Sequence, residues 1–120
     1  MTKKVYIVDD DEGILDAISL ILEESGYKVE TSSKGNQTYE RVTHFHPDII
    51  LLDVLMSGYD GRKICKILKQ DSKTSKIPVV MISAHPSAKK HVMEYGAEAF
   101  LSKPFETNEL LDTVAKFTNG

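Results

Sequence analysis

Five short apolar segments occur along this chain of 120 residues, and a helix-like pattern follows each of them. The third and fourth segments, "PDIILLD" and "IPVVMIS", are apolar at consecutive positions, which indicates strands that are covered on both faces. This alternation of strands and helices favours a parallel sheet with helices on both of its faces. The strands are predicted over residues 4–9, 27–33, 47–53, 77–83 and 97–103.

Between the strands, apolar residues recur every three or four positions, as they do on the buried side of a helix. In the third helix, Ile64, Ile67 and Leu68 are expected to face the core, and "SGYDG" before it is predicted as a turn. For five strands with right-handed crossovers, we expect the flavodoxin-like order 2-1-3-4-5 in a doubly wound α/β fold. Helices are predicted over residues 13–26, 36–45, 61–70, 87–95 and 106–117.

The composition is typical of a globular protein, with 41% hydrophobic and 28% charged residues. The length suits a single domain over residues 1–120, and the net charge of −3 gives no reason to expect nucleic-acid binding. We find no apolar run long enough to span a membrane and no signal peptide. The single cysteine, Cys65, excludes an internal disulfide, and a reducing, cytoplasmic setting is expected.

Polar side chains occupy the ends of four predicted strands. Asp9 and Asp10 end the first strand, Asp53 the third, Ser83 the fourth and Lys103 the fifth. Open α/β sheets bind ligands outside the carboxyl ends of their strands, at the point where the strand order reverses. In the expected order, three carboxylates, one hydroxyl and one ammonium group would therefore meet at one edge of the sheet.

This set of groups suits phosphoryl transfer. Two carboxylates about 4 Å apart repel by roughly 4 kcal/mol at an effective dielectric constant near 20, so such a cluster needs water or a cation. Carboxylate oxygens are suited to Mg²⁺, which proteins commonly hold together with a phosphate. An ammonium and a hydroxyl can bind phosphoryl oxygens, and an aspartate can accept the phosphoryl group as an acyl phosphate. The sequence therefore indicates Mg²⁺-assisted phosphoryl transfer to Asp53.

Four stretches, "IVDDD", "LLDVLMSGYDG", "VVMISA" and "AFLSKPF", resemble the receiver domains of two-component response regulators, including those of chemotaxis. The motifs have the same order and spacing as in that family. The resemblance implies that Asp53 is the phosphoacceptor, and that Ser83 and Lys103 bind the phosphoryl group. It also implies a Mg²⁺ site whose ligands are Asp9, Asp10, Asp53 and the backbone carbonyl of Leu55.

The resemblance further implies a signalling role. A sensor histidine kinase or a histidine phosphotransfer protein would donate the phosphoryl group, and the domain would catalyse only its own phosphorylation and dephosphorylation. Ser83 and Phe100 would act as the switch, and the Lys103–Pro104 peptide would be cis. The face formed by the fourth helix, the fifth strand and the fifth helix would bind a downstream output protein or domain, and phosphorylation-dependent homodimerisation through it stays open.

Two alternative functions are kept. The first is a phosphohydrolase with an aspartyl nucleophile, since Asp9 and Asp11 form an Asp-x-Asp after the first strand. That class places its nucleophile on the first strand and usually needs a cap, whereas the acceptor candidate here follows the third strand. The second is a receiver fold used as a phosphorylation-independent binding module. Asp11 and Glu12 are expected to stabilise the positive end of the first helix rather than to bind metal.

Overall fold

The computed structural model describes residues 2–56, 58–90 and 92–118, and it contains a parallel sheet of five strands. The strand order is β2-β1-β3-β6-β7, which in chain order is 2-1-3-4-5. The predicted flavodoxin-like topology is therefore confirmed. The strands are β1 (Lys4–Val8), β2 (Lys28–Ser32), β3 (Ile49–Asp53), β6 (Val79–Ser83) and β7 (Ala99–Ser102).

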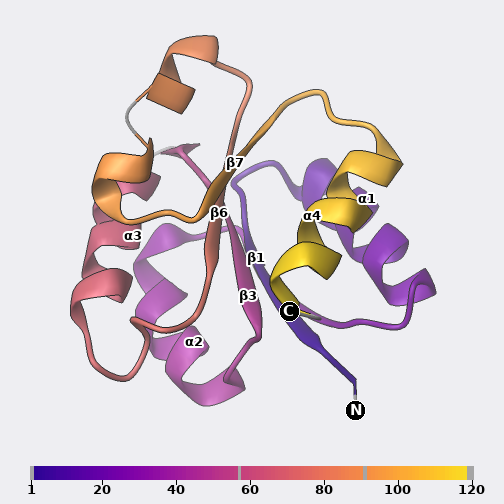
Figure 1. The fold of residues 1–120 in the computed structure, drawn as a ribbon, viewed down its shortest axis with the longest axis horizontal. Helices are drawn as coiled ribbons and strands as arrows, with labels where there is room; N and C mark the ends of the chain where they lie inside the picture. The colour runs from indigo at the N-terminus through magenta and orange to yellow at the C-terminus, as the bar shows by residue number, and fades with distance from the viewer. Residues whose placement is uncertain (1, 57, 91, 119–120) are drawn as a thin grey trace.

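Helices cover both faces of the sheet. Helices α1 (Glu12–Glu24) and α4 (Thr107–Thr118) lie on one face, and α2 (Thr38–Phe45) and α3 (Gly61–Gln70) lie on the other (Figure 1). Alternate residues of β3 supply the two cores, with Ile49 on the α1–α4 side and Ile50 on the α2–α3 side. All five residues of β3 and of β6 are buried, which explains their unbroken apolar sequences. Among the described residues, no helix has the length and apolar character needed to cross a bilayer.

The predicted helix over residues 87–95 is wrong. The described part of this segment forms two 3₁₀ helices, η2 (Pro86–Lys90) and η3 (Val92–Tyr95), and position 91 lies outside the described residues. A short helix depends on the burial of an apolar face. Val92 is buried and Ala88 and Tyr95 pack against the core, so the apolar face that predicted a helix is present, but the described backbone around it is 3₁₀ rather than α-helical. The segment does end at Gly96, as predicted, with a φ of 92° that suits glycine.

Two smaller expectations also need correction. The segment predicted as a turn over residues 57–61 contains part of a hairpin, in which β4 (Leu55–Met56) pairs antiparallel with β5 (Tyr59–Asp60); Ser57 lies outside the described residues. Ile67, predicted to face the core, is 56% exposed. At about 100° per residue, Ile64, Cys65 and Leu68 form the buried strip of α3, and position 67 falls outside that strip. A short 3₁₀ turn, η1 (Gly35–Gln37), precedes α2.

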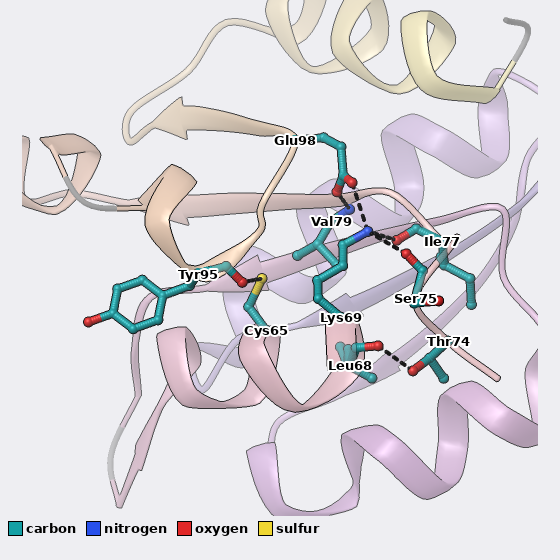
Figure 2. Close-up of polar contacts among 9 residues, drawn as sticks. All are labelled: Cys65, Leu68, Lys69, Thr74, Ser75, Ile77, Val79, Tyr95 and Glu98. Atoms are coloured by element: carbon teal, nitrogen blue, oxygen red, sulfur yellow. Dashed lines mark hydrogen bonds and ion pairs between the residues drawn. The ribbon is translucent and has the colours of Figure 1, made fainter. Parts of the chain in front are cut away.

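Lys69, near the end of α3, forms hydrogen bonds and an ion pair with the segments that precede β6 and β7, as Figure 2 shows. Its ammonium group donates hydrogen bonds to the carbonyl oxygens of Ile77 at 2.6 Å and Ser75 at 3.1 Å. It also pairs with Glu98 Oε2 at 2.7 Å, while Glu98 Oε1 accepts a hydrogen bond from the Val79 backbone N–H at 2.7 Å. One lysine therefore joins α3 to the segment before β6 and to the segment before β7.

Replacement of Lys69 by methionine tests this junction. Lys69→Met should lower the free energy of unfolding by about 1–3 kcal/mol, because two carbonyl groups and a carboxylate lose their partner. Chemical denaturation measures the change. The matched control is Lys66→Met on the same helix, where the lysine is exposed and forms no ion pair with any described residue. Equal losses for the two variants would contradict the role assigned to Lys69.

Candidate functional site

The strand register places the predicted polar residues at one edge of the sheet. Asp53 is the last residue of β3 and lies opposite Ile82 of β6, so Ser83 is one position further along the neighbouring strand. Ser83 in turn pairs with Ser102 at the end of β7, and Lys103 follows directly. The carboxyl ends of the parallel strands thus bring residues from distant parts of the sequence together.

Three carboxylates meet at this edge. Oxygens of Asp9, Asp10 and Asp53, one from each side chain, lie within 4.8 Å of one another. Asp9 and Asp53 are buried, with 1% and 5% of their surface exposed, whereas Asp10 is exposed. Burial removes water that would otherwise screen the negative charges, so the cluster is electrostatically unfavourable without a cation.

Lys103 supplies a positive charge at the site. Its Nζ lies 2.6 Å from Asp9 Oδ2 and 3.7 Å from Asp53 Oδ2. The backbone N–H of Lys103 donates to the carbonyl of Ser83 at 2.8 Å, so the lysine is held by the end of β6. One ammonium group offsets only part of the charge of three carboxylates.

The charge imbalance is evident at Asp53. Burial, and after it the charge of the neighbouring Asp9, raise the pKa of its carboxyl group, which stands at about 6 rather than 3.8. Lys103 and the backbone N–H of Leu55 lower this pKa in part, and Asp10 raises it slightly. An additional positive charge would therefore be electrostatically favourable at this site. Its carboxylate oxygens are the ligand atoms that Mg²⁺ prefers. By donor chemistry and by charge, these residues fit a magnesium ion.

Asp11 has a different task from its two neighbours. Its Oδ1 accepts a hydrogen bond from the Ile14 N–H at 3.2 Å and caps the first turn of α1. Its own N–H donates to Asp9 Oδ1 at 2.9 Å, so Asp11 also helps to orient Asp9. Glu12 lies in the first turn of α1, where a negative charge is favourable. Asp11 and Glu12 thus lie at the start of α1, as expected, whereas Asp9 and Asp10 belong to the carboxylate cluster.

The remaining predicted site residues lie around this cluster. Ser83 is buried, and its Oγ accepts a hydrogen bond from the His85 N–H at 3.0 Å. Leu55 is exposed, two positions after Asp53. Phe100 is partly buried against the core on the α2–α3 side, opposite Met81 of β6. The Lys103–Pro104 peptide is cis, as the resemblance implied, while the individual roles of Ser83, Leu55 and Phe100 stay predictions.

Gly61 is a positioning residue that the sequence reasoning missed. A Cβ at this position would lie 2.0 Å from the carbonyl oxygen of Asp53, which is far closer than atoms can approach. Its N–H donates to the carbonyl of Val54 at 2.8 Å. The absence of a side chain therefore lets α3 begin directly against the end of β3. In the sequence, the feature that could have identified this position is a glycine directly after Asp60, the residue that caps α3.

The raised pKa of Asp53 predicts an unusual dependence of stability on pH. Because the folded protein holds the Asp53 proton more tightly than the unfolded chain, stability falls as pH rises from about 4 to about 6 and stays lower above that. In metal-free buffer at pH 7.5, Asp53→Asn should thus raise the free energy of unfolding by about 1–3 kcal/mol. Denaturant titrations at several pH values measure this gain.

The gain should become small near pH 4, where Asp53 is protonated in the folded protein and about half protonated in the unfolded chain, and it should vanish at lower pH. The exposed Asp112, replaced in the same way, controls for the general loss of one negative charge. A loss of stability in Asp53→Asn at pH 7.5, or a gain that persists unchanged at pH 4, would show that Asp53 is not destabilised by its surroundings.

Comparison with known proteins adds independent information. The family model of the response regulator receiver domain matches residues 5–115. A protein from Chloroflexus aurantiacus assigned as a response regulator is 32% identical, with a TM-score of 0.94 and full coverage of both chains. Chemotaxis protein CheY4 of Vibrio cholerae is 29% identical, with a TM-score of 0.90 over 98% of this chain and 99% of its own.

A more distant structure shares the fold alone. The receiver domain of sensor histidine kinase PA1611 from Pseudomonas aeruginosa is 20% identical, with a TM-score of 0.91 and full coverage of both chains. That protein has a magnesium ion coordinated in its active-site cleft.

Proposed function

The chain belongs to the response regulator receiver domain family, and from that premise we propose that Asp53 accepts a phosphoryl group in a two-component phosphorelay. The donor would be a phosphohistidine on a sensor histidine kinase or on a histidine phosphotransfer protein. Receiver domains are generally signalling modules rather than classical enzymes, and the chemistry proposed here is limited to phosphorylation and dephosphorylation of the domain itself. We propose that residues 1–120 act as one such domain.

The position of Asp53 is the observation that carries this proposal. Its carboxylate lies at the end of a buried strand, beside two further carboxylates and the Lys103 ammonium. In the transfer, an Asp53 oxygen attacks phosphorus, the bond from phosphorus to the donor imidazole nitrogen breaks, and that nitrogen keeps the electron pair. In the absence of a bound cation the pKa of Asp53 is about 6, so its carboxylate is mostly ionised at neutral pH and can act as a nucleophile.

We propose that Asp9, Asp10 and Asp53 hold Mg²⁺, with the backbone carbonyl of Leu55 as a further ligand. The bound ion would neutralise negative charge on the phosphoryl group during its transfer. Support comes from the carboxylate donor set and from its unbalanced charge. The magnesium ion in the Pseudomonas receiver domain, which has the same fold, is consistent with this assignment.

Lys103 and Ser83 are proposed to bind the phosphoryl oxygens once Asp53 is modified. The Lys103 ammonium is already 3.7 Å from Asp53 Oδ2, so a phosphoryl group there would lie within reach of it. The Ser83 hydroxyl accepts a hydrogen bond from the His85 N–H, and that contact uses an oxygen lone pair rather than the hydroxyl proton. The proton is thus suited to a phosphoryl oxygen.

These two proposed contacts with the phosphoryl group also suggest how phosphorylation could change the conformation of the proposed output surface. Ser83 ends β6 directly before η2, and Lys103 follows β7, which carries Phe100. Attraction of both residues to the phosphoryl group would shift these segments and, with them, the Phe100 ring. The proposed output surface is formed by η2, η3, β7 and α4, where a downstream protein or domain, or a second phosphorylated copy, would bind.

Phosphorylation by a small donor tests the proposal. In Mg²⁺ and acetyl phosphate, the intact mass should increase by one phosphoryl group, and Asp53→Asn or removal of Mg²⁺ by EDTA should abolish the gain. Asp10→Ala should also abolish it, because a predicted metal ligand is lost. The matched control is Asp11→Ala, which removes the cap of α1 and should retain most of the reaction.

Identical behaviour of the Asp10 and Asp11 variants, or phosphorylation of Asp53→Asn, would refute these assignments. No mass gain in the wild type would favour the phosphorylation-independent binding module. The phosphohydrolase alternative predicts repeated turnover of a small phosphomonoester. The cap that Asp11 forms on α1 counts against it, because that aspartate of the Asp-x-Asp pair is already engaged by the helix.

A further inference from the structure

An apolar groove lies between α2, the β4–β5 hairpin and α3. Its volume is about 490 Å³. Tyr39 of α2, Tyr59 of β5 and Ile67 of α3 line it, and all three are exposed although they are large and apolar. Ile67 is the residue that the helical pattern placed in the core. Exposed aromatic and aliphatic side chains gathered along one groove are typical of protein–protein contacts.

The helix along this groove and the segment that follows it are strongly basic. Residues 61–76 contain six lysine or arginine residues and one aspartate, although the whole chain has a net charge of −3. Lys63 lines the groove and Lys66 lies one turn further along α3. Both are exposed, as are Lys73 and Lys76, and none of the four forms an ion pair with another described residue.

The nearby acidic groups have closer partners than these lysines and offset their charge only in part, since Lys63 acts on Asp60 and Lys73 on Asp71 without an ion pair. Asp60 forms a bidentate pair with Arg62, with the shortest contact at 2.8 Å. Asp71 accepts a hydrogen bond from the Tyr39 hydroxyl at 2.7 Å and another from the Lys73 N–H at 2.8 Å. Lys63 and Lys66, at and next to the groove, thus present positive charge to solvent that Asp60 offsets only in part.

The groove is formed in advance of any binding. The hydrogen bond to Asp71 holds the Tyr39 ring at the groove wall. At the floor, Gly35 packs so closely that a Cβ there would lie 2.8 Å from Ile64 Cδ1 and 3.1 Å from Tyr59 Cβ. A preformed surface loses less conformational entropy on binding than one that must be ordered.

We propose that this groove binds an acidic amphipathic helix of a partner protein. Its apolar side chains would lie between Tyr39, Tyr59 and Ile67, and its carboxylates would face Lys63 and Lys66. The charge of the surface selects an acidic partner over a basic one, and the apolar walls select a segment with apolar side chains at helical spacing over a purely acidic chain. This binding is separate from phosphorylation of Asp53 and from the proposed output surface.

A designed peptide tests the groove directly. The probe is a peptide of about 15 residues with leucine and phenylalanine at i, i+3, i+4 and i+7 and glutamate between them. Added to ¹⁵N-labelled protein, it should cause saturable amide shifts around Tyr39, Tyr59 and Ile67. Ile67→Ser should weaken binding by about tenfold or more, and so should the double variant Lys63→Glu with Lys66→Glu. Added salt should weaken it as well.

Matched controls keep the test specific. Leu20→Ser removes an exposed leucine on α1, at the opposite face of the sheet, and should leave binding unchanged. A peptide with serine in place of its apolar residues, and one with lysine in place of glutamate, should not bind. All variants change exposed side chains, and their amide spectra verify that the fold is retained.

Several results would overturn the proposal. These are the absence of saturable shifts, shifts confined to another face, or equal binding by the serine-substituted peptide. Two further results would also contradict the proposal, because they would show that the groove binds a second copy of this chain or a nucleic acid instead of an acidic helix. One is a dimer in sedimentation experiments that Ile67→Ser abolishes, and the other is preferential competition by a duplex DNA oligonucleotide.

Discussion

The mutual repulsion of Asp9, Asp10 and Asp53 is the interaction on which the site depends. The sheet holds these carboxylates together because β1 and β3 are adjacent and their buried residues fix the register. The hydrophobic core thus maintains an arrangement that electrostatics alone would separate. Lys103 relieves part of the repulsion, and the raised pKa of Asp53 reflects the remainder. The same imbalance explains why a divalent cation and then a phosphoryl group could be accommodated there.

The local backbone gives each carboxylate a defined orientation. Asp9 is held at both oxygens, by the Asp11 N–H and by Lys103, and it is buried, whereas the Asp10 side chain is exposed to solvent. Gly61 allows α3 to begin against the carbonyl of Asp53. An acidic sequence of three successive aspartates is therefore divided into an oriented residue, an exposed residue and a helix cap, each with different chemistry.

The sheet order and the meeting of Asp9, Asp53, Ser83 and Lys103 could be predicted because β3 and β6 have unbroken apolar sequences that end in polar residues. Features set by tertiary contacts could not. The segment over residues 87–95 has a helical pattern and contacts the core, yet its described backbone forms two 3₁₀ helices, and Ile67 lies outside the buried strip of α3. The contact of Gly61 with Asp53 depends on how closely a helix approaches a strand, which no local pattern reports.

Thermal unfolding in the presence of MgCl₂ tests most directly whether the carboxylate cluster is a cation site. At a hundredfold excess of Mg²⁺ over its Kd, binding to the folded protein adds about 2.7 kcal/mol, which raises Tm by several degrees. The account predicts this rise in the wild type and in Asp11→Ala, and its loss in Asp10→Ala. NaCl at matched ionic strength should not reproduce it. A rise of the same size with NaCl, or an unchanged rise in Asp10→Ala, would contradict the assignment of Asp9, Asp10 and Asp53 as the metal site.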